Sequence, residues 1–227
     1  MTPVFLPSTT RAQCERAPQH PRNLGEIHEY WRSPDDGANS PESYLDGVPR
    51  SAVLADIISR YAARDTPILE VGCNVGRNLN FLFRRGFSDL AGIEISEAAV
   101  RLLGRTFPEM ARVAKILNGP VEGIAPVLDD GRYGMVYTMA VLEHIHPSSE
   151  WVFGELVRIT DRYLITIEDE RNQTWRHFPR KYDQVFTSLG MNQVEENSCA
   201  EVPGLGPVFV ARVFEKRSTD SPPELTP

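Results

Sequence analysis

The sequence predicts an α/β fold in which a mostly parallel sheet is covered by helices on both faces. Short apolar runs bounded by turn residues are typical of buried strands, and segments with helical periodicity stand between them. A glycine-containing turn, Gly-Cys-Asn-Val-Gly from residue 72, directly follows the first apolar run. A turn of this kind between a strand and a helix is typical of βα units that bind a nucleotide.

The predicted elements follow one another in a regular order. Strands are expected over residues 68–71, 90–94, 134–140, 163–167, 191–199 and 207–214. Helices are expected over residues 51–61, 78–85, 96–107 and 181–189. The first helix carries an apolar stripe with helical spacing, and Ser96 is a suitable N-cap for the third. Pro67 precedes the first strand and Gly190 ends the last helix.

The turn after the first strand carries the most specific chemical signal in the chain. Gly72 and Gly76 let the backbone turn sharply and let a ligand approach where a Cβ atom would otherwise lie. Asn74 stands between them, and asparagine tolerates left-handed backbone better than most residues. Glu94 ends the second strand about 20 residues beyond the turn, where nucleotide-binding βαβ folds place a carboxylate that accepts hydrogen bonds from ribose hydroxyls.

The spacing of the glycines distinguishes between classes of cofactor. Dinucleotide folds prefer Gly-x-Gly-x-x-Gly, in which the third glycine permits close packing of the helix. Here Gly72, Asn74 and Arg77 occupy those three places, and Gly76 comes one step early. A nicotinamide dinucleotide is therefore disfavoured.

These residues resemble the first motif of the class I S-adenosylmethionine-dependent methyltransferases, acidic-x-Gly-x-Gly-x-Gly, with Glu70 as the acidic residue and Asn74 at the middle glycine. A second string, Leu-Glu-His-Ile over residues 142–145, is similar to many small-molecule members of this class. The resemblance covers residues 50–216. It implies a Rossmann-like αβα sandwich whose mostly parallel seven-stranded sheet ends in an antiparallel C-terminal hairpin. It also implies S-adenosylmethionine as cofactor and S-adenosylhomocysteine as product.

The resemblance implies a set of cofactor contacts at the carboxyl ends of the strands. The expected cofactor-binding residues are Glu70, Gly72, Cys73, Asn74, Gly76, Asn78, Glu94, Ile95, Pro120, Val121, Glu122 and Met139. The acidic residue of the first motif suits a positively charged cofactor and also orders the amides of the loop. Proline stands where the class commonly has an aspartate for the adenine amine. That contact is therefore assigned to the backbone at Pro120 and Val121, with Glu122 as the carboxylate.

The acceptor side of the site is expected near two histidines. His144 and His146 are each expected to serve either as the general base for a hydroxyl acceptor or as a structural hydrogen-bonding residue. Glu168 and Glu170 follow the next strand, where they either bind a cationic or hydroxyl-rich substrate or lie in a solvated loop. His177 and its neighbouring arginines either neutralise these carboxylates or bind an anionic group. Because His-x-His carries little ligand information, we expect metal independence.

One domain with distinct ends is expected from the length and composition. The predicted segments are a flexible N-terminus over 1–24, a lid over 25–50, a cofactor-binding domain over 51–217 and a disordered tail over 218–227. Tyr30 and Trp31 are the expected substrate contacts of the lid, and packing on the core is the alternative reason for these aromatic residues.

Composition narrows the expected partners. The 227 residues carry a net charge of −7 and contain no run of Lys or Arg, which argues against a nucleic-acid substrate. No apolar stretch has the length of a membrane span and no secretory signal is evident, so a cytoplasmic protein is expected. The three cysteines have no zinc-binding spacing. We expect a small-molecule substrate, and the sequence is compatible with a homodimer.

The function expected from these observations is methyl transfer to an oxygen or nitrogen of a small natural-product or sugar intermediate. Oxygen is favoured because histidines stand near the expected methyl group. The alternatives are an amine N-methyltransferase, an RNA or protein methyltransferase, a nicotinamide-dependent oxidoreductase and a non-catalytic cofactor-binding module.

Overall fold

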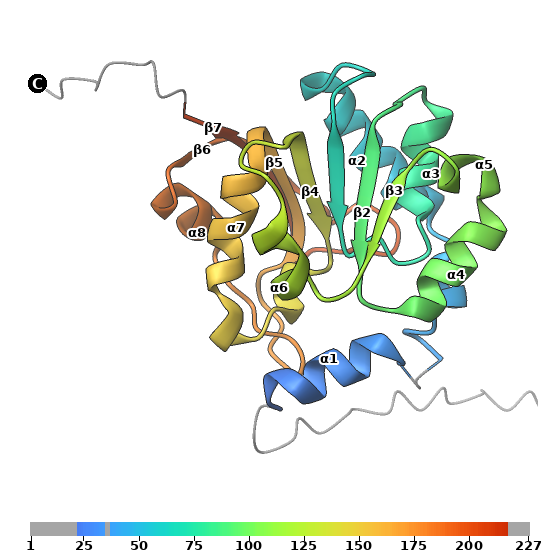
Figure 1. Ribbon diagram of the computed structural model, residues 1–227. Helices are drawn as coiled ribbons and strands as arrows, with labels where there is room; N and C mark the ends of the chain where they lie inside the picture. Colours follow the sequence, from blue (N-terminus) through green and yellow to red (C-terminus); the bar gives the residue numbers. More distant parts are fainter. Residues whose placement is uncertain (1–21, 35–36, 218–227) are drawn as a thin grey trace, which may run out of the picture.

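The central feature of the fold is a sheet enclosed between two layers of helices (Figure 1). It is seen in a computed structural model that describes residues 22–34 and 37–217. The C-terminal tail, and all but the last three residues of the N-terminal segment predicted to be flexible, lie outside the described residues.

The sheet has seven strands in the order β3-β2-β1-β4-β5-β7-β6. The strands are β1 Ile68–Val71, β2 Leu90–Glu94, β3 Lys115–Asn118, β4 Tyr133–Met139, β5 Thr160–Asp169, β6 Met191–Ser198 and β7 Phe209–Lys216. The first five pair in parallel, and β7 lies antiparallel between β5 and β6. This confirms the predicted mostly parallel sheet with its antiparallel hairpin. The strand order reverses between β1 and β4, and α/β sheets bind ligands at such a switch point.

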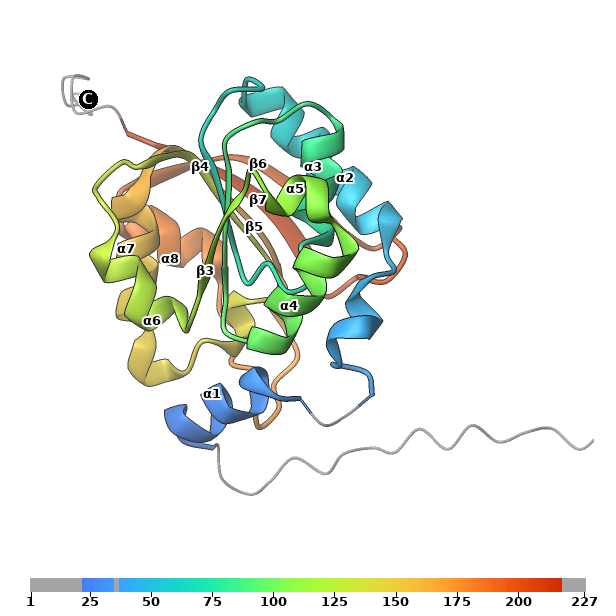
Figure 2. The same ribbon diagram turned by 45° about the vertical axis from the view of Figure 1, so that its right-hand side comes forward.

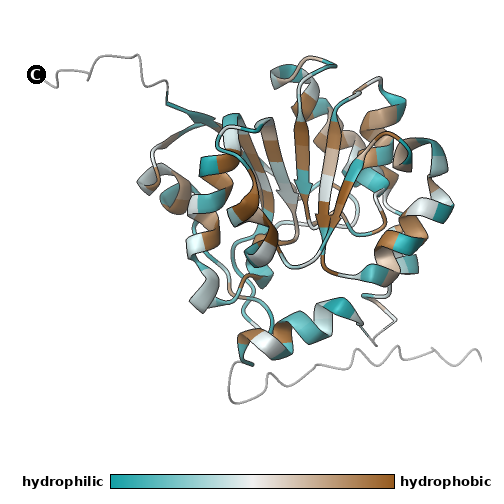
Figure 3. Ribbon diagram, viewed as in Figure 1, coloured by the Kyte–Doolittle hydropathy of each residue, from teal (hydrophilic) through white to brown (hydrophobic). Residues whose placement is uncertain are grey.

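Helices cover both faces of the sheet, and Figure 2 shows the two layers from a second side. One layer contains α2 Val48–Tyr61, α3 Arg77–Arg84, α4 Glu97–Thr106 and α5 Pro108–Ala111. The other contains α6 Val121–Ile124, α7 Trp151–Ile159 and α8 Tyr182–Ser188. Because side chains alternate along a strand, Ile68 packs into the first layer and Leu69 into the second. Hydrophobic residues accordingly concentrate on the strands and the inner sides of the helices (Figure 3).

Most predicted element boundaries agree with the structure to within three residues. The elements that were not predicted include the strand β3 and the helices α1 (Leu24–Arg32), α5, α6 and α7. Gly154 interrupts the middle of α7, which weakens its sequence signal, yet four apolar side chains of this helix are buried against the sheet. Burial in the tertiary structure therefore stabilises a helix whose local pattern is ambiguous.

The first helix, α1 Leu24–Arg32, begins inside the segment predicted to be flexible. Asn23 and Glu26 form a capping box: the Asn23 carboxamide accepts from the Glu26 backbone N–H at 3.1 Å, and the Glu26 carboxylate accepts from the Asn23 N–H at 2.9 Å. These reciprocal bonds satisfy two backbone donors and define the start of the helix. Helix α1 therefore starts at the last residue of that segment.

The segment expected to form a lid lies across the carboxyl ends of the strands (Figure 1). It consists of α1 and a short 3-10 helix, η1 Pro41–Tyr44. Two hydrogen bonds join α1 to the domain: the Ser96 hydroxyl donates to the Arg32 carbonyl at 3.1 Å, and His28 Nε2 lies 3.0 Å from Glu122 Oε1. No helix in the described part of the chain combines the length and apolar character needed to cross a membrane.

Candidate functional site

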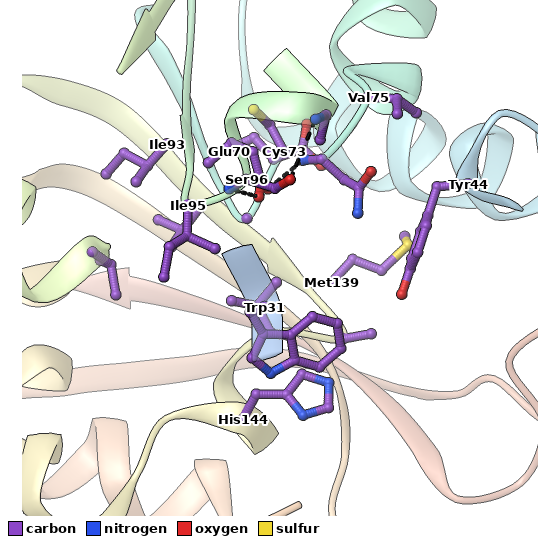
Figure 4. A pocket seen from close by; sticks show the side chains of 18 of the residues that line it. Trp31, Tyr44, Glu70, Cys73, Val75, Ile93, Ile95, Ser96, Met139 and His144 are labelled. Carbon is purple, nitrogen blue, oxygen red and sulfur yellow. Dashed lines mark hydrogen bonds between the residues drawn. The ribbon is translucent and has the colours of Figure 1, made fainter. Parts of the chain in front are cut away.

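A pocket opens at the switch point, between the carboxyl ends of the central strands and α1 (Figure 4). Most of the predicted site residues line it. They are Trp31, Glu70, Gly72, Cys73, Asn74, Asn78, Glu94, Ile95, Pro120, Val121, Glu122, Met139 and His144. The structure therefore gathers residues from five separate chain segments at one cavity.

The turn after β1 has the left-handed backbone that its sequence requires. Gly72 has φ +72° and Asn74 has φ +47°. A Cβ atom on Gly72 would lie 2.4 Å from a methyl group of Val141, so glycine is needed for space as well as for conformation. The N–H groups of Gly72 and Cys73 donate to the Ile93 carbonyl at 2.8 and 3.0 Å, which ties the turn to β2.

Glu70 lies at the buried base of this turn. Its Oε1 accepts from the Asn78 side-chain amide at 2.8 Å, and the Asn78 carbonyl oxygen accepts from the Ser51 hydroxyl at 2.7 Å. Its Oε2 has no hydrogen-bond partner among the described residues. Burial raises the pKa of Glu70 to about 8, since a charged carboxylate is poorly solvated there. Glu70 is therefore a buried carboxyl group, protonated at neutral pH, with one oxygen that makes no hydrogen bond to a described residue.

Glu94 orders two loops at the end of β2. One carboxylate oxygen accepts from the Asn74 N–H at 2.8 Å, and the other accepts from the Ser96 N–H at 2.7 Å. Burial raises the pKa of Glu94, while these backbone hydrogen bonds oppose that shift. Glu94 thus fixes the glycine turn relative to the start of α4, and each oxygen retains further acceptor capacity.

The wall beyond Glu94 is largely apolar. Ile93, Ile95 and Val121 line it, and Pro120 precedes α6 in extended backbone. Glu122 also faces the pocket, and its carboxylate lies 3.0 Å from His28 Nε2 of α1. This region therefore combines apolar surface with a single carboxylate that is already held by α1.

The opposite end of the pocket contains His144, which lies against Trp31 (Figure 4). The centroids of their rings are 4.4 Å apart. His144 Nδ1 lies 2.9 Å from the Arg176 carbonyl, and because a carbonyl only accepts, Nδ1 carries the proton. Burial and the neighbouring His177 lower the pKa of His144 to about 3. His144 is therefore a neutral imidazole whose Nε2 lone pair is available, and it is a weaker base than the sequence analysis expected.

A reciprocal pair of carboxyl groups holds the loop that carries His144. One oxygen of Glu168 accepts from the N–H groups of Val141 and Leu142, both at 2.9 Å. Glu143 in turn accepts from the N–H of Asp169 at 2.7 Å. Burial, together with the nearby Glu168, raises the pKa of Glu143 to about 10. These contacts join the end of β4 to the end of β5.

Several residues predicted for the site do not line the pocket. Glu168 is fully buried beneath the loop, and Glu170 forms an ion pair with Arg212 at 2.7 Å, so neither lies in a solvated loop or faces the cavity. His146 hydrogen-bonds Ser148 at the start of a short 3-10 helix. Tyr30, Gly76 and His177 also lie outside the lining. These placements follow from side-chain directions that strand alternation alone does not determine.

The structure adds pocket residues that the sequence analysis missed. Arg77 and Ser96 stand next to motif residues in the sequence, so their position at the pocket could have been predicted. Tyr44 and Arg50 carry no such signal, because the folded chain brings them to the pocket from the segment around η1. Arg50 forms no ion pair with a described residue, and its Nε has no hydrogen-bond partner among the described residues.

Residues 48–184 match a family model described as a methyltransferase domain. The chain belongs to this methyltransferase family. The match covers more than half of the sequence and includes the glycine turn, Glu94 and the loop that carries His144. The predicted resemblance to class I S-adenosylmethionine-dependent methyltransferases is confirmed, and so is the predicted cofactor class.

Solved structures with the same fold share little sequence with this methyltransferase. Magnesium protoporphyrin IX methyltransferase from Synechocystis PCC 6803, with bound S-adenosylhomocysteine, is 14% identical with a TM-score of 0.67, over 86% of this chain and 100% of that one. Geranyl diphosphate C-methyltransferase from Streptomyces coelicolor is 13% identical with a TM-score of 0.62, over 85% and 98%. An S-adenosylmethionine-dependent methyltransferase from Archaeoglobus fulgidus is 13% identical with a TM-score of 0.57, over 73% and 94%. No curated protein sequence matches the chain significantly.

Proposed function

We propose that this methyltransferase transfers a methyl group from S-adenosylmethionine to an oxygen of a small molecule. The observation that carries the proposal is one continuous pocket with two chemically different ends. One end has the glycine turn, Glu70 and Glu94, and the other has a neutral histidine under an aromatic residue of α1. A cofactor and an acceptor would therefore meet inside the same cavity.

The first end of the pocket fits the cofactor. Glu94 has acceptor capacity for ribose hydroxyls, and the apolar wall at Ile95 and Val121 fits a flat adenine ring. The unpartnered oxygen of Glu70 fits the amino-acid end, where the ligand carries an amine. Arg50 supplies a cation for the carboxylate at that same end. When bound, S-adenosylmethionine supplies a methyl group already activated by its sulfonium.

The second end of the pocket favours a small acceptor. The segment around α1 covers this end, and Trp31, Met139 and Ile145 provide apolar contacts. Methyl transfer needs alignment of the donor and acceptor and exclusion of water, and an enclosed apolar surface serves both needs. The net charge of −7 supports a small molecule over a nucleic acid.

The Nε2 lone pair of His144 favours an oxygen acceptor. An uncharged amine is already a nucleophile, whereas a hydroxyl gains from a neighbouring lone pair that accepts its hydrogen bond and orients its oxygen. Because the pKa of His144 is lowered, the imidazole serves as this hydrogen-bond acceptor and not as a strong base. His144 Nε2 is a lone-pair donor at the acceptor end, and its Nδ1 proton is held by the Arg176 carbonyl. Methylation of an amine is the second candidate and needs no such group.

Binding and turnover test the proposal separately. Calorimetric titration with S-adenosylhomocysteine, with NADH and NADPH as controls, should show micromolar binding of the first ligand alone. Labelled methyl groups from S-adenosylmethionine should then enter a low-molecular-mass fraction of a cell extract. Label that enters only RNA or protein would contradict the small-molecule acceptor, and tight binding without any transfer would favour a non-catalytic role.

A further inference from the structure

Three side chains that commonly bind metal ions converge behind the acceptor end of the pocket. They are Glu143, His144 and His177, and one ligand atom from each lies within 4.8 Å of the other two. The gap between Glu143 Oε1 and His144 Nε2 is 3.9 Å. Bonds of about 2.1 Å to a common ion place ligand atoms roughly 3 to 4 Å apart. Side-chain adjustments of about 1 Å or less would therefore bring all three into a coordination shell.

The hydrogen bonds around this cluster orient it for a cation. A metal-binding histidine usually donates its other ring N–H to a carbonyl or carboxylate, which fixes the tautomer. His144 does so, because Nδ1 donates to the Arg176 carbonyl at 2.9 Å and leaves the Nε2 lone pair facing Glu143. The other oxygen of Glu143 is anchored by the Asp169 N–H at 2.7 Å. His177 lies beside His144, with ring centroids 4.7 Å apart.

The cluster also adjoins a second buried carboxyl group. Glu143 and Glu168 are two adjacent carboxyl groups, each at most 3% exposed. Within the described residues, neither forms an ion pair with a lysine or arginine. Buried carboxyl groups side by side are costly unless a proton or a cation compensates them. His144 Nε2 lies 3.9 Å from Glu143 Oε1, and a histidine nitrogen binds a cation through its lone pair.

We propose that Glu143, His144 and His177 bind one divalent transition-metal ion at the acceptor end of the pocket. Two imidazole nitrogens and one carboxylate oxygen suit zinc and its first-row neighbours, whereas magnesium prefers oxygen ligands. Metal independence was expected from the sequence. In the structure His146 hydrogen-bonds Ser148, Glu168 accepts from backbone N–H groups and Glu170 pairs with Arg212, while His177 joins the cluster from a later segment of the chain.

The role of the ion in the reaction depends on the proposed function, methyl transfer to an oxygen. An ion bound through His144 Nε2 would lie beside the acceptor end, where the ion would take over that lone pair's role: the acceptor hydroxyl would bind the ion, which lowers the pKa of the hydroxyl. The hydroxyl proton then passes to water, the oxygen forms its bond to the methyl carbon, and the electron pair of the broken carbon–sulfur bond stays on sulfur. An acceptor with adjacent oxygen atoms, such as a vicinal diol or hydroxy acid, would bind such an ion most firmly.

Metal binding is measurable without knowledge of the acceptor. Zn²⁺ is titrated by calorimetry into chelator-treated protein, with Mg²⁺ in a parallel titration. We expect one Zn²⁺ per chain and much weaker Mg²⁺ binding. Loss of a residue that merely hydrogen-bonds a metal ligand lowers metal affinity roughly 10- to 100-fold. His177→Ala and Glu143→Gln each remove a direct ligand, so their affinity for Zn²⁺ should fall by at least that much. Glutamine retains an oxygen for the Asp169 N–H, which limits damage to the fold.

His146→Ala is the matched control, because His146 stands two residues from His144 yet hydrogen-bonds Ser148 outside the pocket. It should bind Zn²⁺ as the unaltered protein does. S-Adenosylhomocysteine binding by each variant reports whether the cofactor end remains folded. Absence of Zn²⁺ binding in protein that binds S-adenosylhomocysteine would overturn the metal site, as would an unchanged affinity in both ligand variants. Zn²⁺ binding without S-adenosylhomocysteine binding would instead contradict the proposed function and leave the metal site standing.

Discussion

Replacement of Gly72 by alanine should damage both the fold and the cofactor site. The change adds a Cβ atom 2.4 Å from a methyl group of Val141, in a backbone with φ +72°. Left-handed backbone costs a non-glycine residue about 1 to 2 kcal/mol, and overpacking of a filled site adds about 1 to 3 kcal/mol. The expected loss in the free energy of unfolding is therefore about 2 to 5 kcal/mol.

Gly86→Ala is the control that separates conformation from crowding. Gly86 also has positive φ, +87°, but no atom lies within 4 Å of the position where its Cβ would stand. This variant should lose only the conformational part, about 1 to 2 kcal/mol. Gly86 does not line the pocket, so its replacement should leave ligand affinity unchanged.

Two measurements check the reasoning about Gly72. Urea unfolding gives the free energy of each variant, and calorimetry gives its affinity for S-adenosylhomocysteine. Val141 also lines the pocket, so its displacement should weaken binding by about tenfold or more, equivalent to 1.4 kcal/mol. The double variant Gly72→Ala with Val141→Ala should recover part of the lost stability, because a smaller side chain relieves the contact. Equal destabilisation of the Gly72 and Gly86 variants would refute the steric argument.

Three further predictions concern the buried carboxyl groups. Glu94→Ala should weaken S-adenosylhomocysteine binding by about 1.5 to 3 kcal/mol, the scale of a charged hydrogen bond. Glu97→Ala, on the exposed side of α4, should leave the affinity unchanged. Equal affinities of the two variants in a calorimetric titration would show that Glu94 does not bind the cofactor. In the native state the Glu70 carboxyl keeps its proton up to a pKa of about 8, whereas in the unfolded chain its pKa has the ordinary, lower value. Between these two pKa values the native state binds more protons than the unfolded state, so the free energy of unfolding falls as pH rises. Urea unfolding at pH 5 and 8 should show a smaller fall in Glu70→Gln, and an equal fall would contradict the assignment. Glu168→Ala should lower the free energy of unfolding by at least about 1 to 3 kcal/mol, because it leaves two buried N–H donors that share one oxygen without an acceptor, and unchanged urea unfolding would count against this anchoring role.

The sheet and its glycine turn were predictable because their signals are local. Apolar runs with turn residues between them identify strands, and left-handed positions favour Gly72 and Asn74 over other residues. Two of the missed elements, β3 and α7, lacked such signals. β3 is short and only partly buried, and Gly154 lies inside α7.

The cofactor end of the pocket was also predictable, because most of the expected residues lie at the carboxyl end of a strand or in the turn that follows it. In a parallel sheet the carboxyl ends of neighbouring strands meet at one edge, so adjacency in the motif becomes adjacency in space. The predicted residues Glu70, Gly72, Glu94 and Ile95 accordingly line one cavity. Their assigned contacts with a cofactor stay predictions until binding is measured.

The acceptor end depended on the tertiary structure. Strand alternation suggested that Glu168 and Glu170 share a side, but each carboxylate is bound to partners from other elements and neither reaches the pocket. Likewise, His144 and His146 look equivalent in the sequence, yet only His144 lines the cavity.

The sequence by itself determined the α/β fold, the family and the cofactor edge, because periodicity and backbone conformation are properties of neighbouring residues. Only the tertiary structure decided which titratable groups are buried and which meet. His177 joins Glu143 and His144 through a loop closed by long-range contacts, and the segment from α1 to α2 brings Trp31 and Arg50 to the same pocket. Burial then determines the charge of each group, since desolvation depends on every element packed around it.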